Sequence, residues 1–107
     1  MAVVRIEGLP DDPLEAAAVF HAEWLPRLTE KRGDLVLIFP PADHTHRAWR
    51  LAAVQGLARV AVPHRVNALA GGDAAAIEAG QAYLAAAPGV TGQLLPLDGA
   101  GAGAVIG

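Results

Sequence analysis

The residues best suited to chemistry lie together in the segment Asp43-His44-Thr45-His46. Two imidazoles and a carboxylate are ligand types that zinc and other transition metals bind in proteins. Residues two apart do not share a helix face, so His44 and His46 would both bind a metal only from an extended loop. Asp43 and Thr45 are equally suited to cap a helix. The segment therefore predicts either a metal site at Asp43, His44 and His46 or the start of a helix with exposed imidazoles.

Several other kinds of site are excluded by residue types that the sequence lacks. Its 107 residues include no cysteine and no serine, which excludes thiolate metal sites, disulfides and a serine nucleophile. The net charge is -3, and lysine and arginine do not cluster with aromatic residues, so we expect no nucleic-acid partner. No apolar run approaches the roughly 18 residues of a membrane span, and the N-terminus lacks the features of a signal peptide. We therefore expect a cytoplasmic protein with no membrane partner.

The elements that would position these residues alternate between strand and helix. Short apolar runs predict strands over residues 2–6, 34–39, 64–70 and 90–97. Helical spacing predicts helices that are capped by Asp12, by Asp43 or Thr45, and by Asp73, and that end near residues 29, 60 and 87. Two strands joined by a helix form a βαβ unit, which is typical of parallel sheets. We expect right-handed crossovers that place helices on both faces of the sheet.

Each of the first two predicted helices has an apolar face that should pack on the sheet. Pro26 lies inside the first pattern and predicts a kink or an early end there. Gly56 lies in the middle of the second pattern, where glycine is unfavourable and a small residue is typical of close packing. The predicted faces comprise Leu14, Ala17, Ala18, His21, Trp24, Leu25 and Leu28 in the first helix, and Trp49, Ala52, Ala53, Gly56, Leu57 and Val60 in the second.

Five segments, in this order, resemble the C-terminal half of a short-chain dehydrogenase/reductase. They are GDLVLI (33–38), LAAVQGLAR (51–59), RVNA (65–68), VTGQ (90–93) and LDG (97–99). In that family a strand that ends near a catalytic serine precedes a helix with a Tyr-x-x-x-Lys motif, and RVN and VTGQ strands complete the sheet. The resemblance covers about residues 12–99. It implies a three-layer, partly Rossmann-like α/β domain over residues 1–99, with a short parallel sheet of about four strands and helices on both faces. Residues 100–107 would form a Gly/Ala-rich tail.

The same resemblance implies that the catalytic groups of the family are replaced. It places Arg47 at the position of the tyrosine and Leu51 at the position of the lysine. A leucine has no proton to relay and an arginine stays protonated, so neither can exchange a proton with a carbonyl or an alcohol. The Gly-rich dinucleotide fingerprint belongs to an N-terminal half that this sequence does not contain. We therefore expect a truncated, catalytically degenerate member of the family, a pseudoenzyme with no catalytic residue.

A vestigial NAD(P) site is the alternative to a protein without a cofactor. Asn67, Gly71 and Gly72 lie toward the carboxyl end of a predicted parallel strand, where ligands bind in open α/β sheets. In the family this segment approaches the nicotinamide ring. The resemblance thus implies residual nucleotide binding at these three residues, unless the two glycines serve only to turn the chain.

Self-association is the function that the sequence favours. In the family the two corresponding helices form a dimer interface, so the predicted interface residues are Trp24, Leu28, Trp49 and Leu57. A short sheet without its N-terminal half would also have an unpaired edge. We therefore expect a non-catalytic structural or interaction module that forms a homodimer or tetramer, or that binds a full-length reductase of the same family.

Overall fold

The computed structural model describes residues 1–97, so the predicted tail at 100–107 and residues 98 and 99 lie outside the described part. The strands are β1 (Ala2–Arg5), β2 (Leu35–Phe39), β3 (Val66–Ala70) and β4 (Leu94–Pro96). The helical elements are α1 (Pro13–Val19), the π-helical turn η1 (Phe20–Trp24), α2 (Leu25–Thr29), the 3₁₀ turn η2 (His44–His46), α3 (Arg47–Ala61) and α4 (Ala74–Ala85).

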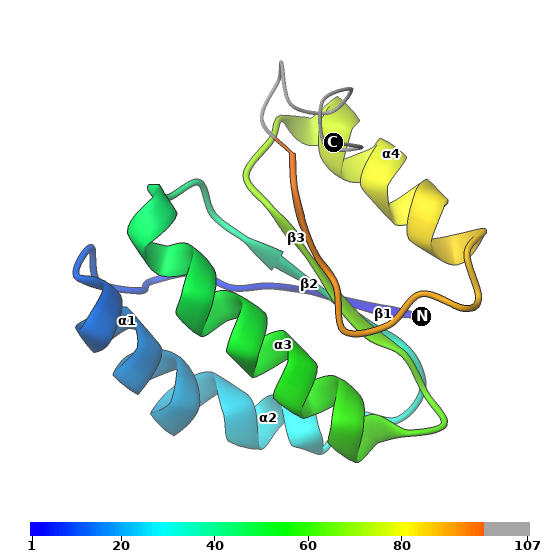
Figure 1. Ribbon diagram of the computed structural model, residues 1–107, viewed down its shortest axis with the longest axis horizontal. Coiled ribbons are helices and arrows are strands. Elements are labelled where there is room, and N and C mark those ends of the chain that lie inside the picture. Colours follow the sequence, from blue (N-terminus) through cyan, green and yellow to red (C-terminus); the bar gives the residue numbers. More distant parts are fainter. Residues whose placement is uncertain (98–107) are drawn as a thin grey trace.

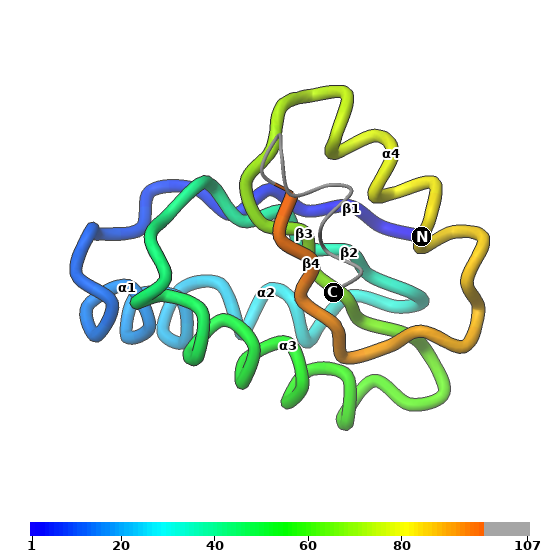
Figure 2. The backbone as a smooth tube through the Cα atoms, turned by 45° about the horizontal axis from the view of Figure 1, so that its top comes forward, coloured from blue at the N-terminus to red at the C-terminus, as the bar shows by residue number. Residues whose placement is uncertain are grey.

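The four strands form one parallel sheet in the order β1-β2-β3-β4. The helices α1, α2 and α3 cover one face of this sheet and α4 covers the other (Figure 1). The tube view shows the same three layers, with the sheet between α4 and the layer of α1 to α3 (Figure 2). The predicted α/β fold with a short parallel sheet and helices on both faces is therefore confirmed.

The hand of the crossovers differs from the prediction. In a parallel sheet whose strands follow chain order, crossovers of one hand place every helix on the same face. Here the connections from β1 to β2 and from β2 to β3 run over one face, whereas α4 connects β3 to β4 over the other. The last crossover therefore has the hand opposite to the first two. Helices cover both faces because of this reversal and not because all crossovers are right-handed.

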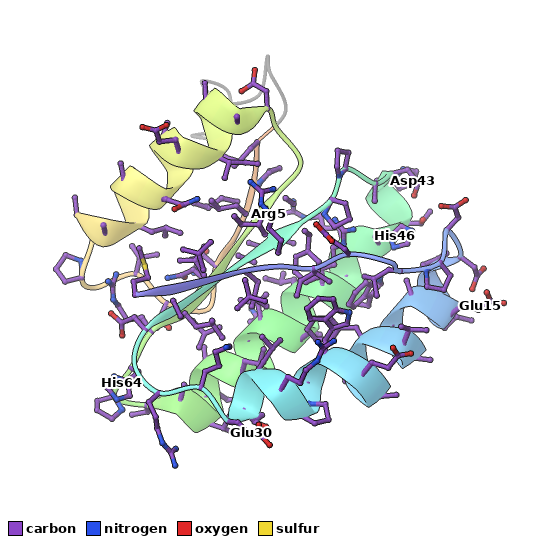
Figure 3. The ribbon with its side chains drawn as sticks, turned by 180° about the vertical axis from the view of Figure 1, so that it is seen from behind. Arg5, Glu15, Glu30, Asp43, His46 and His64 are labelled. Atoms are coloured by element: carbon purple, nitrogen blue, oxygen red, sulfur yellow. The ribbon has the colours of Figure 1, made fainter. Side chains whose placement is uncertain are left out.

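The sheet separates two apolar cores of unequal size. Successive side chains of β2 point to opposite faces: Leu35 and Leu37 join the larger core under α1 to α3, and Val36 and Ile38 join the smaller core under α4. Side chains fill the space between each helix layer and the sheet (Figure 3). All five residues of β2 are buried, as expected of a strand that is covered on both faces.

The first helical segment runs from residue 13 to residue 29 and does not end early at Pro26. Its first turn begins as predicted, because the Asp12 carboxylate accepts a hydrogen bond of 3.0 Å from the backbone N–H of Glu15. In η1 the hydrogen bonding widens, so that the N–H of Leu25 donates to the carbonyl of Phe20. Pro26 then lies in the first turn of α2, where the lack of an N–H costs little.

The π-helical turn also changes which side of this segment faces the sheet. The buried side chains are Ala16, Phe20 and Leu28, whereas Leu14 is 83% exposed and Ala18 and His21 are exposed. A strict 3.6-residue period does not hold across the wider turn, and the predicted face was wrong at these three residues.

The predicted face of α3 was also wrong in part. Its buried residues are Arg50, Ala53, Val54, Leu57 and Ala58, whereas Ala52 and Val60 are exposed. The apolar stripe is shifted toward the side that carries Arg50. The sequence pattern did not reveal this shift because a charged residue was assigned to the solvent side.

Gly56 is not a site of close packing, because a Cβ built at this residue would meet nothing within 4 Å. Close packing occurs instead at Gly80 of α4, where a Cβ would lie 3.0 Å from both methyl carbons of Leu69.

Alanine is favoured over glycine in a helix interior by about 1 kcal/mol. Gly56→Ala is therefore expected to raise the free energy of unfolding by about 1 kcal/mol. The matched Gly80→Ala change should lower it, because Leu69 must move. Urea unfolding followed by circular dichroism measures both; equal effects of the two changes would contradict the packing difference.

An ion pair joins the amino ends of β2 and β3. The Asp34 carboxylate accepts hydrogen bonds from the backbone N–H of Arg65 at 2.8 Å and from its Nε at 3.1 Å. Nη1 of Arg65 donates to the carbonyls of Leu84 and Ala87 at 2.9 and 2.7 Å, at the end of α4. One arginine therefore ties the sheet to the carboxyl end of α4.

These hydrogen bonds predict a loss of stability in acid. The backbone hydrogen bond from Arg65, and then its side chain, lower the pKa of Asp34. Because the pKa of Asp34 is lower in the folded state, its carboxylate stabilises the fold at pH values above the ordinary aspartate pKa of about 4. This stabilisation is lost as the pH falls through the folded-state pKa. Asp34→Asn should therefore be less stable than the wild type at pH 7, and the difference should narrow toward pH 3. Urea unfolding at several pH values tests this; a difference that stays constant with pH would contradict it.

Candidate functional site

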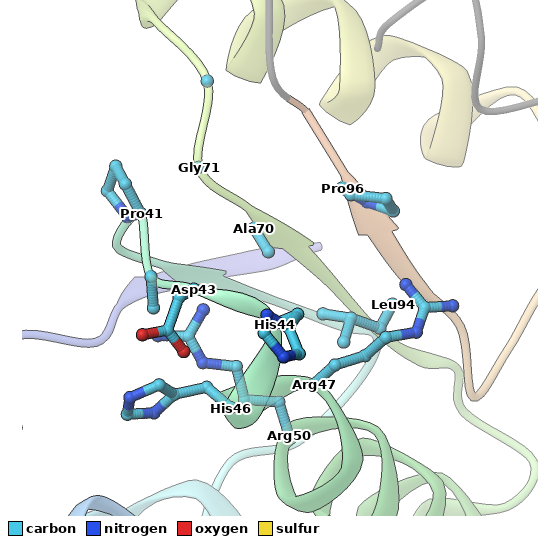
Figure 4. Close-up of a pocket in the computed structure, with 12 residues that line it drawn as sticks. Pro41, Asp43, His44, His46, Arg47, Arg50, Ala70, Gly71, Leu94 and Pro96 are labelled. Carbon is cyan, nitrogen blue, oxygen red and sulfur yellow. The ribbon is translucent and has the colours of Figure 1, made fainter. Parts of the chain in front are cut away.

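A cavity of about 350 Å³ lies at the carboxyl ends of β2, β3 and β4 (Figure 4). Ligands bind in the crevice outside the carboxyl ends of the strands in open α/β sheets. The cavity is thus the candidate site of this fold. The polar and glycine residues that line it are Asp43, His44, His46, Arg47, Arg50, Gly71 and Gly72.

The segment after β2 positions one wall of the cavity. The Asp43 carboxylate accepts hydrogen bonds from the hydroxyl of Thr45 and, at 2.9 Å, from its backbone N–H. These two hydrogen bonds lower the pKa of Asp43, so the carboxylate is ionised at neutral pH. The predicted cap at Asp43 is confirmed, and η2 and α3 follow from it.

His46 is buried, contrary to the expectation of an exposed imidazole. Its Nδ1 accepts a hydrogen bond of 3.1 Å from the indole N–H of Trp49, which can only donate. The proton is therefore on Nε2, which donates to the carbonyl of Asp11 at 2.8 Å. Both ring nitrogens are occupied, and the imidazole joins α3 to the loop after β1.

The three predicted metal ligands do not form a ligand set. Within residues 1–97, no group of three or more His, Asp or Glu side chains lies close enough to hold a metal ion. Asp43 is bonded to Thr45, and His46 has no free lone pair. The segment begins a helix, as in the second of the two interpretations that its sequence allowed, but the imidazole of His46 is buried and not exposed.

The burial of Arg50 is the feature of this site that the sequence did not reveal. The residue is 5% exposed, and its Nη1 donates to the carbonyl of Pro40 at 3.0 Å. Its Cζ atom lies 4.6 Å from the ring centroid of Phe39 and 5.9 Å from that of Trp49. Burial lowers the pKa of Arg50, although a guanidinium remains protonated at neutral pH. The available signal was its spacing to Ala53, three residues on, within the buried stripe of α3.

The predicted nucleotide-contacting residues have different positions. Asn67 is buried within the fold, where its Nδ2 donates to the carbonyl of Val90 at 2.9 Å and its Oδ1 accepts from the N–H of Gln93 at 3.0 Å. The amide thus holds the loop that precedes β4. Gly71 and Gly72 do line the cavity, and both have positive φ angles, of 75° and 84°.

The four predicted interface residues lie mainly inside the chain. Leu28 and Leu57 are buried in the larger core and present almost no surface. The ring of Trp49 packs against Phe20, with 5.4 Å between their centroids, and Trp24 is half-buried with a guanidinium stacked on its ring. Leu28 and Leu57 therefore offer almost no surface to a partner, whereas Trp24 and Trp49 each keep a partly exposed side chain.

The two positions that correspond to the catalytic pair of the family have separate environments. Arg47 is exposed and lines the cavity. Leu51 is half-buried and packs against the larger core. Protons cannot be relayed between these two side chains, because leucine has no ionisable group.

The fold is a partly Rossmann-like α/β fold with a cavity at the carboxyl ends of its strands. Residues 4–97 match the family model described as SDR-like, short chain dehydrogenase-like protein. Because the match spans nearly the whole sequence, the chain belongs to this SDR-like family. Comparisons with curated proteins and with solved structures gave no match. Among residues 1–97, no helix has both the length and the apolar character needed to cross a membrane.

Proposed function

We propose that this chain is a non-catalytic interaction module that associates with a second copy of itself through the outer edge of β1. The backbone N–H groups of Ala2 and Ile6 donate toward β2, to Asp34 and Ile38, both at 2.9 Å. Because N–H and C=O groups alternate in direction along a strand, those of Val3 and Arg5 point away from the sheet. In the described residues no strand lies on that side of β1 (Figure 3).

The side chains near this edge also favour association. Met1 is 54% exposed and Val3 is 43% exposed, so apolar surface adjoins the free backbone groups. Two copies related by a two-fold axis would pair their β1 strands antiparallel and continue the sheet from one copy into the other. Such pairing would satisfy the backbone groups of an edge strand, which otherwise attract unrelated strands.

The absence of catalysis is proposed from the residues at the family's catalytic positions. The sequence contains no serine, and Arg47 and Leu51 stand where the resemblance places the tyrosine and the lysine. No nicotinamide cofactor is part of the proposed function, because both polar ends of Asn67 are already hydrogen-bonded within the chain. The other two predicted cofactor-binding residues, Gly71 and Gly72, have no side chain and could contact a ligand only through their backbone.

The association can be tested at one residue of β1. Proline lacks an N–H but tolerates an edge strand whose N–H faces outward, so Val3→Pro should remove an intermolecular hydrogen bond and keep the fold. Val3→Lys should weaken association by placing a charge at the edge. Light scattering over a range of concentrations should show a dimer for the wild type and a shift toward monomer in both variants.

The matched control is Val60→Lys, which makes the same change at an exposed valine of α3. This variant should associate like the wild type. A wild-type chain that is monomeric at every concentration would overturn the proposal, and so would a dimer that both Val3 variants retain.

A further inference from the structure

We propose that the cavity at the carboxyl ends of β2, β3 and β4 binds a small organic carboxylate, held by Arg50 and Arg47. This inference does not rest on association through β1, because the lining residues all lie beyond that strand. It also differs from nucleotide binding, because the argument depends on two arginines of α3.

The first argument is that Arg50 is a buried cation without a counter-charge. The two ion pairs in the described part of the chain both use Asp34, so no carboxylate pairs with Arg50. Its Nε is the one buried side-chain nitrogen or oxygen atom in residues 1–97 without a hydrogen-bond partner. Removing a cation from water costs several kcal/mol unless an anion and hydrogen bonds compensate. One carbonyl and two aromatic rings compensate only in part.

The second argument is the charge around the cavity that Arg50 lines. Arg47 and His44 line the same cavity, as shown in Figure 4; Arg47 begins α3, the helix that carries Arg50, and His44 lies in the preceding turn η2. Asp43 is the one acidic residue in the lining, and its Oδ1 is bonded to Thr45. The two guanidinium groups thus leave the cavity with an excess of positive charge. The amino end of α3 adds to the attraction for an anion.

The third argument is the size and chemistry of the walls. A volume of about 350 Å³ lies at the lower end of the range for small-molecule sites. Ala70, Leu94 and Pro96 provide an apolar wall beside the basic residues. A guanidinium binds a planar carboxylate in a bidentate manner. A carboxylate on a short apolar body fits this combination better than inorganic phosphate, which would leave the apolar wall without contacts.

The test uses benzoate as the probe and benzamide as its uncharged counterpart. Two-dimensional ¹H–¹⁵N NMR of the full chain resolves the two indole N–H groups. The indole of Trp49 contacts His46 and lies near Arg50, whereas that of Trp24 lies on another helical segment. Millimolar benzoate should shift the Trp49 signal in a saturable manner and leave the Trp24 signal in place, at ionic strength matched with sodium chloride. Benzamide should cause no such shift.

Two arginines of α3 provide a matched pair of variants. Arg47→Ala should weaken benzoate binding about fivefold, as expected for one exposed ion pair. Arg59→Ala removes the same charge from an exposed residue in the last turn of the same helix, outside the cavity, and should bind like the wild type. Arg50→Met should weaken binding about tenfold or more. If Arg50→Met does not fold, which the same spectra reveal, the comparison of Arg47→Ala with Arg59→Ala decides.

Three results would overturn the proposal. They are the absence of a saturable shift with benzoate, equal shifts with benzamide, and equal losses in Arg47→Ala and Arg59→Ala. Tighter binding of inorganic phosphate than of benzoate would overturn the assignment to a carboxylate.

Discussion

Gly72→Ala is expected to lower the free energy of unfolding by about 3 kcal/mol. The φ angle of Gly72 is +84°, a left-handed conformation that costs an L-residue about 1–2 kcal/mol. A Cβ on Gly72 would also lie 2.5 Å from the carbonyl oxygen and 2.7 Å from the Cβ of Leu97. This overlap involves backbone and cannot be relieved by a side-chain rotation, so a further cost of about 1–3 kcal/mol is expected. Urea unfolding at a fixed protein concentration measures the sum.

Gly71→Ala separates the two contributions. Its φ angle is +75°, but the nearest atom to a Cβ there, the Cα of Pro41, is 3.9 Å away. The backbone cost remains and the overlap is absent, so a loss of only about 1–2 kcal/mol is expected. If the two alanine variants lose the same stability, the close approach of Leu97 to Gly72 has no energetic consequence and the explanation fails.

Asn67→Leu is expected to lower the free energy of unfolding by about 2–3 kcal/mol. The substitution keeps the approximate volume but removes the hydrogen bonds to the carbonyl of Val90 and the N–H of Gln93. Each backbone group that loses its partner costs about 1–3 kcal/mol when water cannot replace the bond. β4 is only three residues long, so these two bonds form a large part of its attachment.

Gln93→Ala is the control for this prediction, because Asn67 accepts from the backbone of Gln93 and not from its side chain. The Gln93 side chain is exposed, so its removal should change stability by no more than about 0.5 kcal/mol. Thermal and urea unfolding of both variants provide the comparison. An Asn67→Leu protein as stable as the wild type would show that the amide is not the anchor of β4.

Local chemistry explains the parts of the fold that could be predicted from the sequence. The caps at Asp12, Asp43 and Asp73 each accept a backbone hydrogen bond from two or three residues further on. The fully apolar run of β2 indicated a strand covered on both faces. Helix caps and apolar runs depend on residues that are close together in the chain, so they can be recognised in a single sequence.

The parts that could not be predicted depend on contacts between distant residues. His46 meets the carbonyl of Asp11, and Arg50 meets that of Pro40, across loops that sequence spacing does not bring together. The π-helical turn at η1 and the reversed last crossover likewise have no signature in apolar periodicity. The cavity at the carboxyl ends of the strands includes Gly71 and Gly72, which were among the predicted contact residues, whereas the burial of Arg50 was not predicted.

Because of the reversed crossover, α4 and β4 can unfold locally while the rest of the domain stays folded. α4 covers its face of the sheet alone, over the smaller of the two cores, and the chain enters and leaves it beside the edge strand β4. Detaching α4 and β4 would leave β1 to β3 paired and would remove only Leu94 from the larger core under α1 to α3. Amide hydrogens of α4 and β4 should thus exchange with solvent through a partial opening, while those of β2 and α3 exchange only when the whole domain unfolds.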